Sequence, residues 1–116
     1  MKRNDVRRFL LSFLYPNQCP FCDKIIHHAY YACDECTEKL LPPPTASFSH
    51  ISQFFAACAY DDFVKHAVYS MKNNNNGYAA ECFAYYISRI LEDEGIAEKV
   101  DFITFVPTSR EKLFQR

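Results

Sequence analysis

The stretch Cys19-Pro20-Phe21-Cys22, matched further along by Cys33-Asp34-Glu35-Cys36, decides how the first part of this chain folds. Each Cys-x-x-Cys turn presents two sulfurs from one tight reversal of the backbone, and residues 23–32 are long enough to return the second turn to the first. Four cysteinates at this spacing are typical of a structural zinc site, in which protein ligands fill all four corners of a tetrahedron. We therefore expect one structural zinc ion, bound by Cys19, Cys22, Cys33 and Cys36.

Other uses of these cysteines are less consistent with the sequence. Two disulfide bonds would need an oxidising compartment, and no secretory signal peptide or membrane span is recognisable, because Arg7, Arg8 and Ser12 interrupt the apolar positions near the start. A redox-active pair should open a helix on a thioredoxin-like unit, which two motifs at ribbon spacing do not resemble. We expect a cytoplasmic protein with a metal site.

The residues around the two motifs add local expectations. Asp23 follows the first pair, where the backbone needs a residue that tolerates positive φ. A zinc ion with four thiolates carries two net negative charges, so backbone N–H groups should point at the sulfurs. His27 or His28 could replace a cysteine as ligand, although four cysteines are already sufficient.

Composition limits the classes of function. The chain has 116 residues, 49% of them hydrophobic and 23% charged, which fits one ordinary globular domain or a small domain plus a module. Its formal net charge of −1 supplies no general attraction to nucleic acid or anionic lipid. The two cysteines outside the motifs, Cys58 and Cys82, stand among apolar residues and are expected to be buried free thiols.

Residues 42–44 are three consecutive prolines, which favour an extended, semi-rigid spacer. We place a boundary there, giving an N-terminal helix and zinc-ribbon module at 1–44 and a second part at 45–116. In the first part, apolar residues at helical spacing predict a helix from Asp5 to about Leu14, stopped by Pro16. A helical turn is expected over 33–41, with acidic residues at its N-terminus.

The second part has the pattern of strand, two helices and strand. Residues 54–60 are an almost continuous apolar run and predict a buried strand, as residues 102–106 do by alternation. Asp61-Asp62 starts a helix that runs to Lys72, and a wide apolar stripe predicts a second helix over 78–91. A last helix is expected to begin at Thr108-Ser109. Two amphipathic helices with so few strands call for more strands to cover them, so the fold class is α+β or α/β and incomplete.

The order of these elements, from the cysteine pairs through Tyr60 and Met71-Lys72 to Asp101–Pro107, Ser109-Arg110 and Arg116, resembles the N-terminal part of the ComF family. These are competence-associated, phosphoribosyltransferase-like proteins with an N-terminal zinc ribbon. The resemblance implies the start of a type I phosphoribosyltransferase-like fold and a role in DNA uptake or nucleotide chemistry. It also implies a protein partner of the competence machinery, with single-stranded DNA or a nucleotide as further candidate ligands.

The chain departs from that family where the chemistry would lie. Phosphoribosyl pyrophosphate needs a glycine-bearing loop whose amides cradle its 5′-phosphate, and the only two glycines here are Gly77 and Gly95. Asp61-Asp62 imitates the acidic half of such a site without the loop, and an asparagine run follows Lys72 where the family has aromatic and glycine residues. Family members continue through an Arg-Gly-Phe-Asn segment, of which only Arg116 is present here. No catalytic or cofactor-binding residue is therefore assigned beyond the zinc ligands. Two hypotheses result: a ComF-type protein truncated before its donor-binding loop and inactive alone, or a non-catalytic zinc-binding interaction module for nucleic acid or a protein partner.

Overall fold

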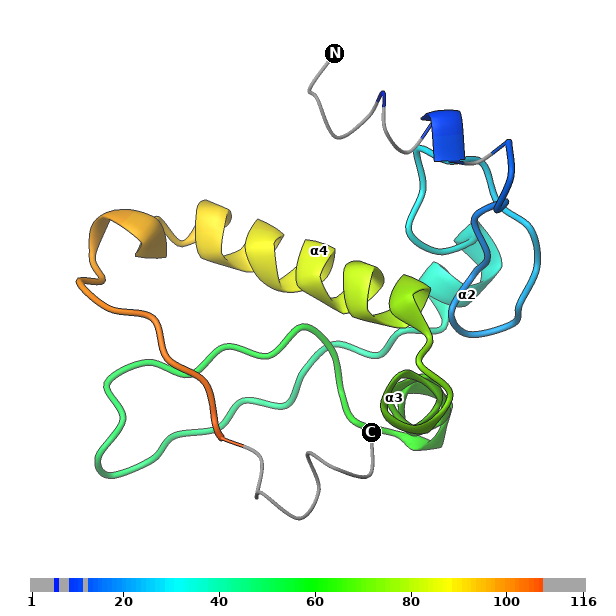
Figure 1. Cartoon of the computed structure of the whole chain (residues 1–116). Helices are drawn as coiled ribbons and strands as arrows, with labels where there is room; N and C mark the ends of the chain where they lie inside the picture. The colour runs from blue at the N-terminus through cyan, green and yellow to red at the C-terminus, as the bar shows by residue number, and fades with distance from the viewer. Residues whose placement is uncertain (1–5, 7–8, 12, 108–116) are drawn as a thin grey trace.

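The structure is a computed structural model, and it describes residues 6, 9–11 and 13–107. Within these residues the order of elements is α2 (Asp34–Glu38), α3 (Asp62–Asn73), α4 (Gly77–Asp93) and the short 3-10 helix η1 (Ile96–Glu98). Figure 1 shows α4 across the middle of the molecule, with the cysteine-rich loops at one of its ends. The described part of the chain contains helices, turns and two isolated β-bridges. It contains no β-strand longer than these bridges.

The first cysteine pair lies in a tight loop closed by backbone bonds. Gln18 and Ile25 form an antiparallel bridge, and the Cys19 N–H donates to the Lys24 carbonyl at 2.8 Å. The Asp23 N–H in turn donates to the Cys19 carbonyl at 2.9 Å. Asp23 has φ of 59°, which confirms the expected left-handed residue after the first pair. The loop therefore reverses where the sequence predicts it.

The two long helices begin at side chains that cap them. The Asp61 carboxylate accepts a hydrogen bond from the Val64 N–H at 2.9 Å, which starts α3. The Asn76 side chain accepts from the N–H groups of Tyr78 and Ala79, which starts α4 immediately after the asparagine run. Such caps satisfy N–H groups that have no partner inside the helix. Both predicted helices are confirmed, and Asp61-Asp62 is a helix start.

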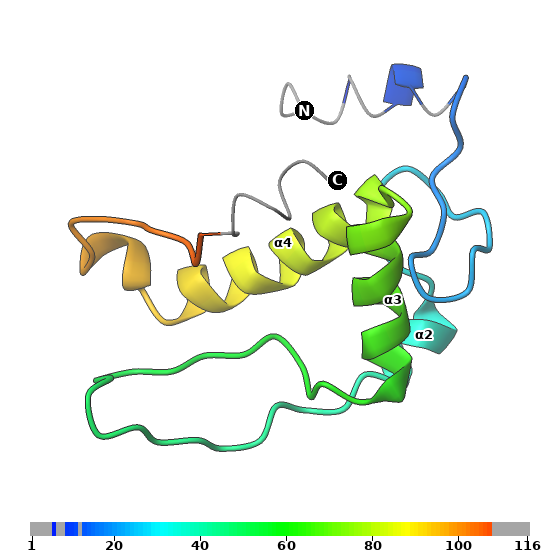
Figure 2. The same cartoon turned by 60° about the horizontal axis from the view of Figure 1, so that its bottom comes forward.

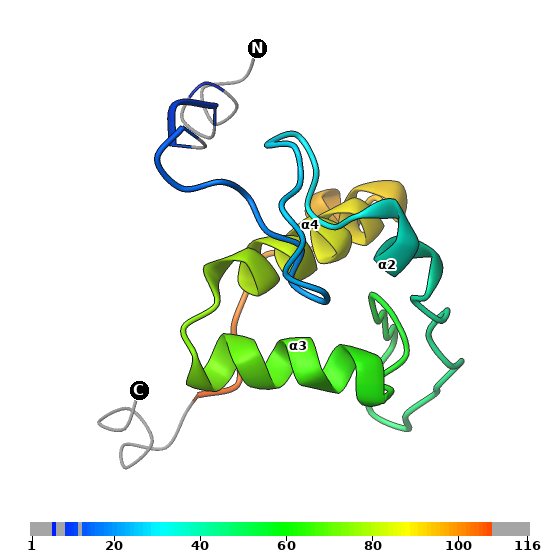
Figure 3. The ribbon, with the colours of Figure 1, turned by 90° about the vertical axis from the view of Figure 1, so that its right-hand side faces the viewer.

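The hydrophobic core joins the ribbon to the helices. Cys19, Ala32 and Cys36 from the ribbon pack with Cys82 of α4 in one buried cluster. Phe21, Tyr31, Phe63 and Tyr86 pack around it. In Figure 3 the first cysteine loop reaches down to the place where α3 and α4 meet. The buried centre of this protein is therefore shared between the segments before and after the prolines.

Aromatic pairs hold this contact together. The Phe21 ring stacks on Phe63 of α3 with centroids 4.9 Å apart and meets Phe83 of α4 edge-on at 6.1 Å. Tyr31 stacks on Tyr85 at 4.4 Å. Each such pair stabilises packing beyond the area that it buries. The division into 1–44 and 45–116 remains a prediction about the chain, but the ribbon is docked on α3 and α4.

The two expected strands are the main correction. Residues 54–60 and 102–106 form no ladder within the described residues, and so no sheet is seen. Figure 2 shows residues 41–59 as a long open hairpin beside α4. Its arms are joined by the Phe48–Ile51 bridge at the tip and by the Ala59 N–H donating to the Leu41 carbonyl at the base. Prolines 42–44 have no N–H to donate, so the arm facing 54–60 cannot complete a ladder. The described residues therefore give no support to the expected start of a phosphoribosyltransferase-like α/β fold.

The expectations at the two ends of the chain fall mostly on residues outside the described part. Val6 and residues 9–11 are helical, whereas Asp5, Arg7 and Arg8 of the expected first helix are not among the described residues. The helix expected from Thr108-Ser109 onward, with Arg116, also lies outside them. The turn over 33–41 is a shorter helix than expected, because α2 ends at Glu38. In the described part of the chain, no helix has the length and apolar character needed to cross a membrane.

Candidate metal centre

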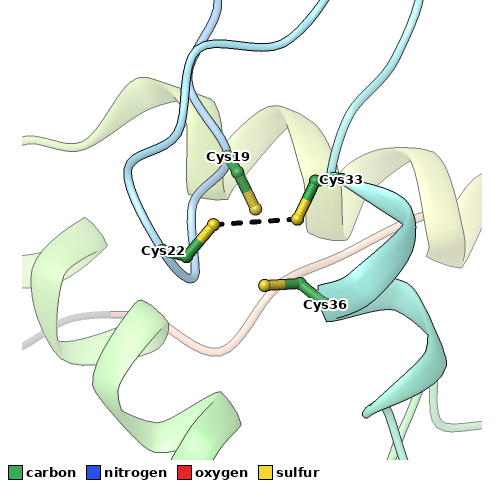
Figure 4. A group of neighbouring side chains, drawn as sticks. All are labelled: Cys19, Cys22, Cys33 and Cys36. Carbon is green, nitrogen blue, oxygen red and sulfur yellow. Dashed lines mark hydrogen bonds between the residues drawn. The ribbon is translucent and has the colours of Figure 1, made fainter.

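Two different local structures bring the four cysteines together. Cys19 and Cys22 come from the tight loop that turns at Asp23, while Cys33 is the N-cap of α2 and Cys36 lies in its first turns. The acidic residues Asp34 and Glu35 occupy the first turn of α2, where their negative charges interact favourably with the helix dipole. Figure 4 shows the four sulfur atoms pointing toward a common centre.

The geometry fits one tetrahedral zinc ion. All four Sγ atoms lie within 4.8 Å of one another, and the Cys22 and Cys33 sulfurs are 3.7 Å apart. Zinc–sulfur bonds of about 2.3 Å place the corners of a tetrahedron about 3.8 Å apart. A disulfide needs a sulfur–sulfur distance of about 2.05 Å, and all six cysteines are free. The cluster is consistent with structural zinc, as the spacing predicts.

The four cysteines differ in their access to solvent. Cys19 and Cys36 are almost fully buried, at 0% and 3% exposure, whereas Cys33 is partly covered and Cys22 is exposed. The centre therefore has an inner side that faces α4 and an outer side that faces water. An ion at this place would cross-link the first loop to α2 from the interior of the molecule.

The backbone stabilises the thiolate of Cys19. Burial disfavours its charge, but backbone N–H groups of Cys33, Phe21 and Cys22 directed at the sulfur outweigh burial and lower its pKa to about 7. These are the N–H groups that a tetrathiolate centre requires around its ligands. Cys36 behaves in the opposite way, because burial and the neighbouring thiols raise its pKa. Without a cation, ionisation of all four thiols is opposed by repulsion between the thiolates. A divalent metal ion offsets this repulsion.

The remaining cysteines and the histidines stay outside the cluster. Among the described residues, only the four expected cysteines have metal-ligating atoms grouped in this way. The His27 Nδ1 accepts from the Ala29 N–H at 3.3 Å, and its ring lies against His28. Cys82 is fully buried beneath the cluster and Cys58 is partly buried, so burial raises the pKa of both thiols, to about 12 for Cys82. Cys82 is therefore the buried free thiol that the sequence predicts, whereas Cys58 is a free thiol that is only partly buried.

An ion pair across the two motifs is a feature that the motif analysis missed. The Lys24 Nζ lies 2.7 Å from Glu35 Oε2, which links the residue after the loop turn to the middle of the second motif. The signal was available in the sequence, because Lys24 and Glu35 have the same separation of 11 residues as Cys22 and Cys33. When Cys22 and Cys33 come together, Lys24 and Glu35 are therefore brought close to each other as well.

The expected phosphate-site residues do not form a second site. Asp61 uses its carboxylate to cap α3, and Lys72 is exposed in the last turn of that helix. Two grooves among the described residues lie elsewhere, along the hairpin and α4, and are lined by Pro43, Phe54, Phe55 and Ile90 among others. No charged side chain lines either of these grooves.

Comparison with known families agrees with the metal centre. Residues 10–48 match the model of the double zinc ribbon domain, which covers about a third of the chain. The matched segment contains both cysteine motifs and all three prolines of the spacer. No curated protein and no solved structure matches the chain. The zinc ribbon is thus supported by family, by sequence spacing and by geometry.

Proposed function

We propose that this chain is a zinc-binding interaction module, in which Cys19, Cys22, Cys33 and Cys36 hold one structural zinc ion and binding, not catalysis, is the activity. The observation that carries the proposal is the convergence of the four sulfurs, two of them from the hydrophobic core. A site whose four positions are all protein ligands leaves no open position for a substrate. The zinc ion would therefore have a structural role and stabilise the fold of the ribbon, whose surface would bind the partner.

Metal analysis of the purified full chain tests the zinc centre. We expect one zinc ion per chain, and its loss in the variants Cys22→Ser and Cys36→Ser. Cys58→Ser is the matched control, because Cys58 lies outside the sulfur cluster and should leave the zinc content unchanged. Zinc-free protein with its thiols paired as disulfides would refute the proposal.

A protein partner fits the surface of the ribbon better than nucleic acid does. Residues 17–41 carry four acidic side chains, Asp23, Asp34, Glu35 and Glu38, against two basic ones, Lys24 and Lys39. Phosphate backbones are bound by clustered Lys and Arg, which the ribbon does not have. The apolar side chains Ile25 and Tyr30 are more than half exposed on the same segment. Titration with a labelled single-stranded oligonucleotide at physiological salt should give no binding tighter than about 1 μM, the upper end of non-specific affinity.

A second candidate is a ComF-type, phosphoribosyltransferase-like protein of which this chain is the N-terminal portion. Its support is the order of motifs along the sequence and the apolar segment 102–106, which is suited to a strand and lies exposed. This chain alone should then be inactive, because α3 starts where a phosphate loop would be needed and no glycine allows close approach to an anion. Calorimetric titration of the full chain with phosphoribosyl pyrophosphate and magnesium should show no heat of binding. Micromolar binding would contradict this expected inactivity and would mean that the chain holds a phosphate site after all.

A further inference from the structure

The surroundings of the metal centre are short of positive charge. A zinc ion with four thiolates has two net negative charges, and the ribbon around it has twice as many acidic as basic side chains. Three of those acidic residues, Asp34, Glu35 and Glu38, lie in α2, the helix that supplies Cys36. Some group must offset this charge at the side where the sulfurs meet water.

Lys24 is placed to do so. Its backbone carbonyl accepts the Cys19 N–H at 2.8 Å, and its own N–H is directed at the Cys22 sulfur. Its ammonium is held at 2.7 Å from the carboxylate of Glu35, a residue between Cys33 and Cys36 in the second motif. Lys24 and Glu35 each follow a ligand by two residues, so their ion pair is in register with the Cys22 and Cys33 sulfurs, which lie 3.7 Å apart. These are the two ligands that the protein interior covers least.

We infer that Lys24 is the counter-charge of the zinc centre, a positioning residue that strengthens metal binding by holding its ammonium beside the outer thiolates. This inference rests on the proposed zinc site. The other basic side chain of the ribbon, Lys39, lies at the C-terminal end of α2, where it interacts with the field of that helix and of Glu35. Lys24 is thus a cation that joins the two cysteine motifs, because it follows Cys22 by two residues and is ion-paired with Glu35.

A charge role and a mechanical role predict different results for the two partners of the ion pair. If the pair only ties the loop to α2, removal of either side chain should weaken zinc binding equally. If Lys24 is the counter-charge, removal of the ammonium should weaken binding, whereas neutralising Glu35 removes a negative charge next to a dianionic centre and should not. Both side chains are more than half exposed, so salt should screen the effect.

The experiment is a competition between the full-length protein and a calibrated zinc chelator, with cobalt titration as a second readout of the tetrathiolate spectrum. Lys24→Gln should lower zinc affinity about tenfold at low salt, the lower range for groups that surround metal ligands. Lys24→Arg should restore wild-type affinity, and Glu35→Gln should remain within about twofold of wild type or bind more tightly. Lys65→Gln is the control, because Lys65 is an exposed lysine on α3 whose acidic neighbour is Asp62.

Several results would overturn the inference. Lys24→Gln within twofold of wild type would show that the ammonium contributes nothing, and equal losses in Lys24→Gln and Glu35→Gln would show a mechanical tie. A loss that is the same at 1 M salt as at low salt would also contradict a charge effect at this exposed site. A wild-type chain that binds no zinc would be a failure of the proposed zinc site itself, and that result is seen before any variant is compared.

Discussion

The ribbon and the segment 102–106 are both irregular backbone rich in apolar residues, yet one is buried and the other is not. Cys19 and Cys36 of the ribbon are 0% and 3% exposed, whereas Phe102 and Val106 are each 92% exposed. The ribbon has its partners encoded nearby, in two motifs separated by ten residues, and it meets α4 through aromatic rings. The segment 102–106 has strand-forming residues but no ladder partner among the described residues. Burial therefore follows the availability of a partner, and apolar content alone does not secure it.

Removal of zinc should have the largest effect on this comparison. Structural zinc contributes roughly 10 kcal/mol or more to the folding of small ribbons, so a strong chelator should unfold residues 17–41. Because the sulfurs share a core with Cys82, the docked end of α4 should loosen as well. Hydrogen exchange is the measurement: the amides of Cys19 and Ile26, which are bonded within the loop, should lose protection.

The segment 102–106 is the internal control for that experiment. Its amides should exchange rapidly with and without zinc, since the segment forms no ladder among the described residues and its side chains are exposed. Retained protection of the ribbon amides after complete metal removal would contradict the idea that the sulfur cluster holds this region.

A matched pair of phenylalanines should show a smaller difference in stability. Phe21 lies between Phe63 and Phe83, so Phe21→Ala should lower the free energy of unfolding by about 2 kcal/mol, less than for a fully buried ring. Phe102→Ala should change it by less than about 0.5 kcal/mol, because the ring is exposed. Denaturant unfolding of the zinc-loaded protein measures both. Equal effects would mean that the ribbon is not docked as Figure 3 shows.

The parts of this structure that could be predicted from the sequence depend on local chemistry. Cys-x-x-Cys spacing specifies the sulfur cluster, Asp23 specifies a left-handed turn, and Asp61 marks the start of α3. In each case the group that satisfies a residue lies within a few positions of it, or in a second copy of the same motif. Periodicity located α3 and α4 for a similar reason, because a helix makes its own backbone hydrogen bonds.

The parts that could not be predicted depend on distant partners. The apolar run 54–60 is typical of a strand, but a strand needs a neighbour, and the facing arm contains Pro42, Pro43 and Pro44. The contact of Phe21 with α3 and α4 joins residues that no motif connects, so the proline spacer suggested separable parts where the structure packs them together. The Lys24–Glu35 pair could be predicted only in part. The sequence shows that the two residues are in register with the cysteine ligands, but the ion pair itself is seen only in the folded structure.

The cap of α4 should contribute less than the aromatic docking. The Asn76 side chain accepts two backbone N–H groups at 3.1 and 3.3 Å, so Asn76→Ala should lower the free energy of unfolding by about 1 kcal/mol. Asn74→Ala is the control from the same asparagine run, because the hydrogen bond that ends α3 uses the Asn74 backbone and survives the change. Thermal unfolding followed by circular dichroism compares the two. A larger loss in Asn74→Ala would place the start of α4 elsewhere in the run.

The smallest effect on folding, and the sharpest test of the exposed segment, comes from Ile103→Lys. Ile103 is 91% exposed, so the free energy of unfolding should change by less than about 0.5 kcal/mol. Association should change clearly, because an uncharged extended stretch of Phe, Ile, Thr, Phe and Val pairs readily with other strands, and one lysine opposes such pairing. Light scattering over a concentration series should show association of the wild-type chain that is reduced in Ile103→Lys. Ile51→Lys, at the exposed tip of the hairpin, separates this effect from that of an added charge in general. Equal reduction of association by both variants would assign the effect to net charge. Association of Ile103→Lys at the wild-type level would show that the protein does not associate through the segment 102–106.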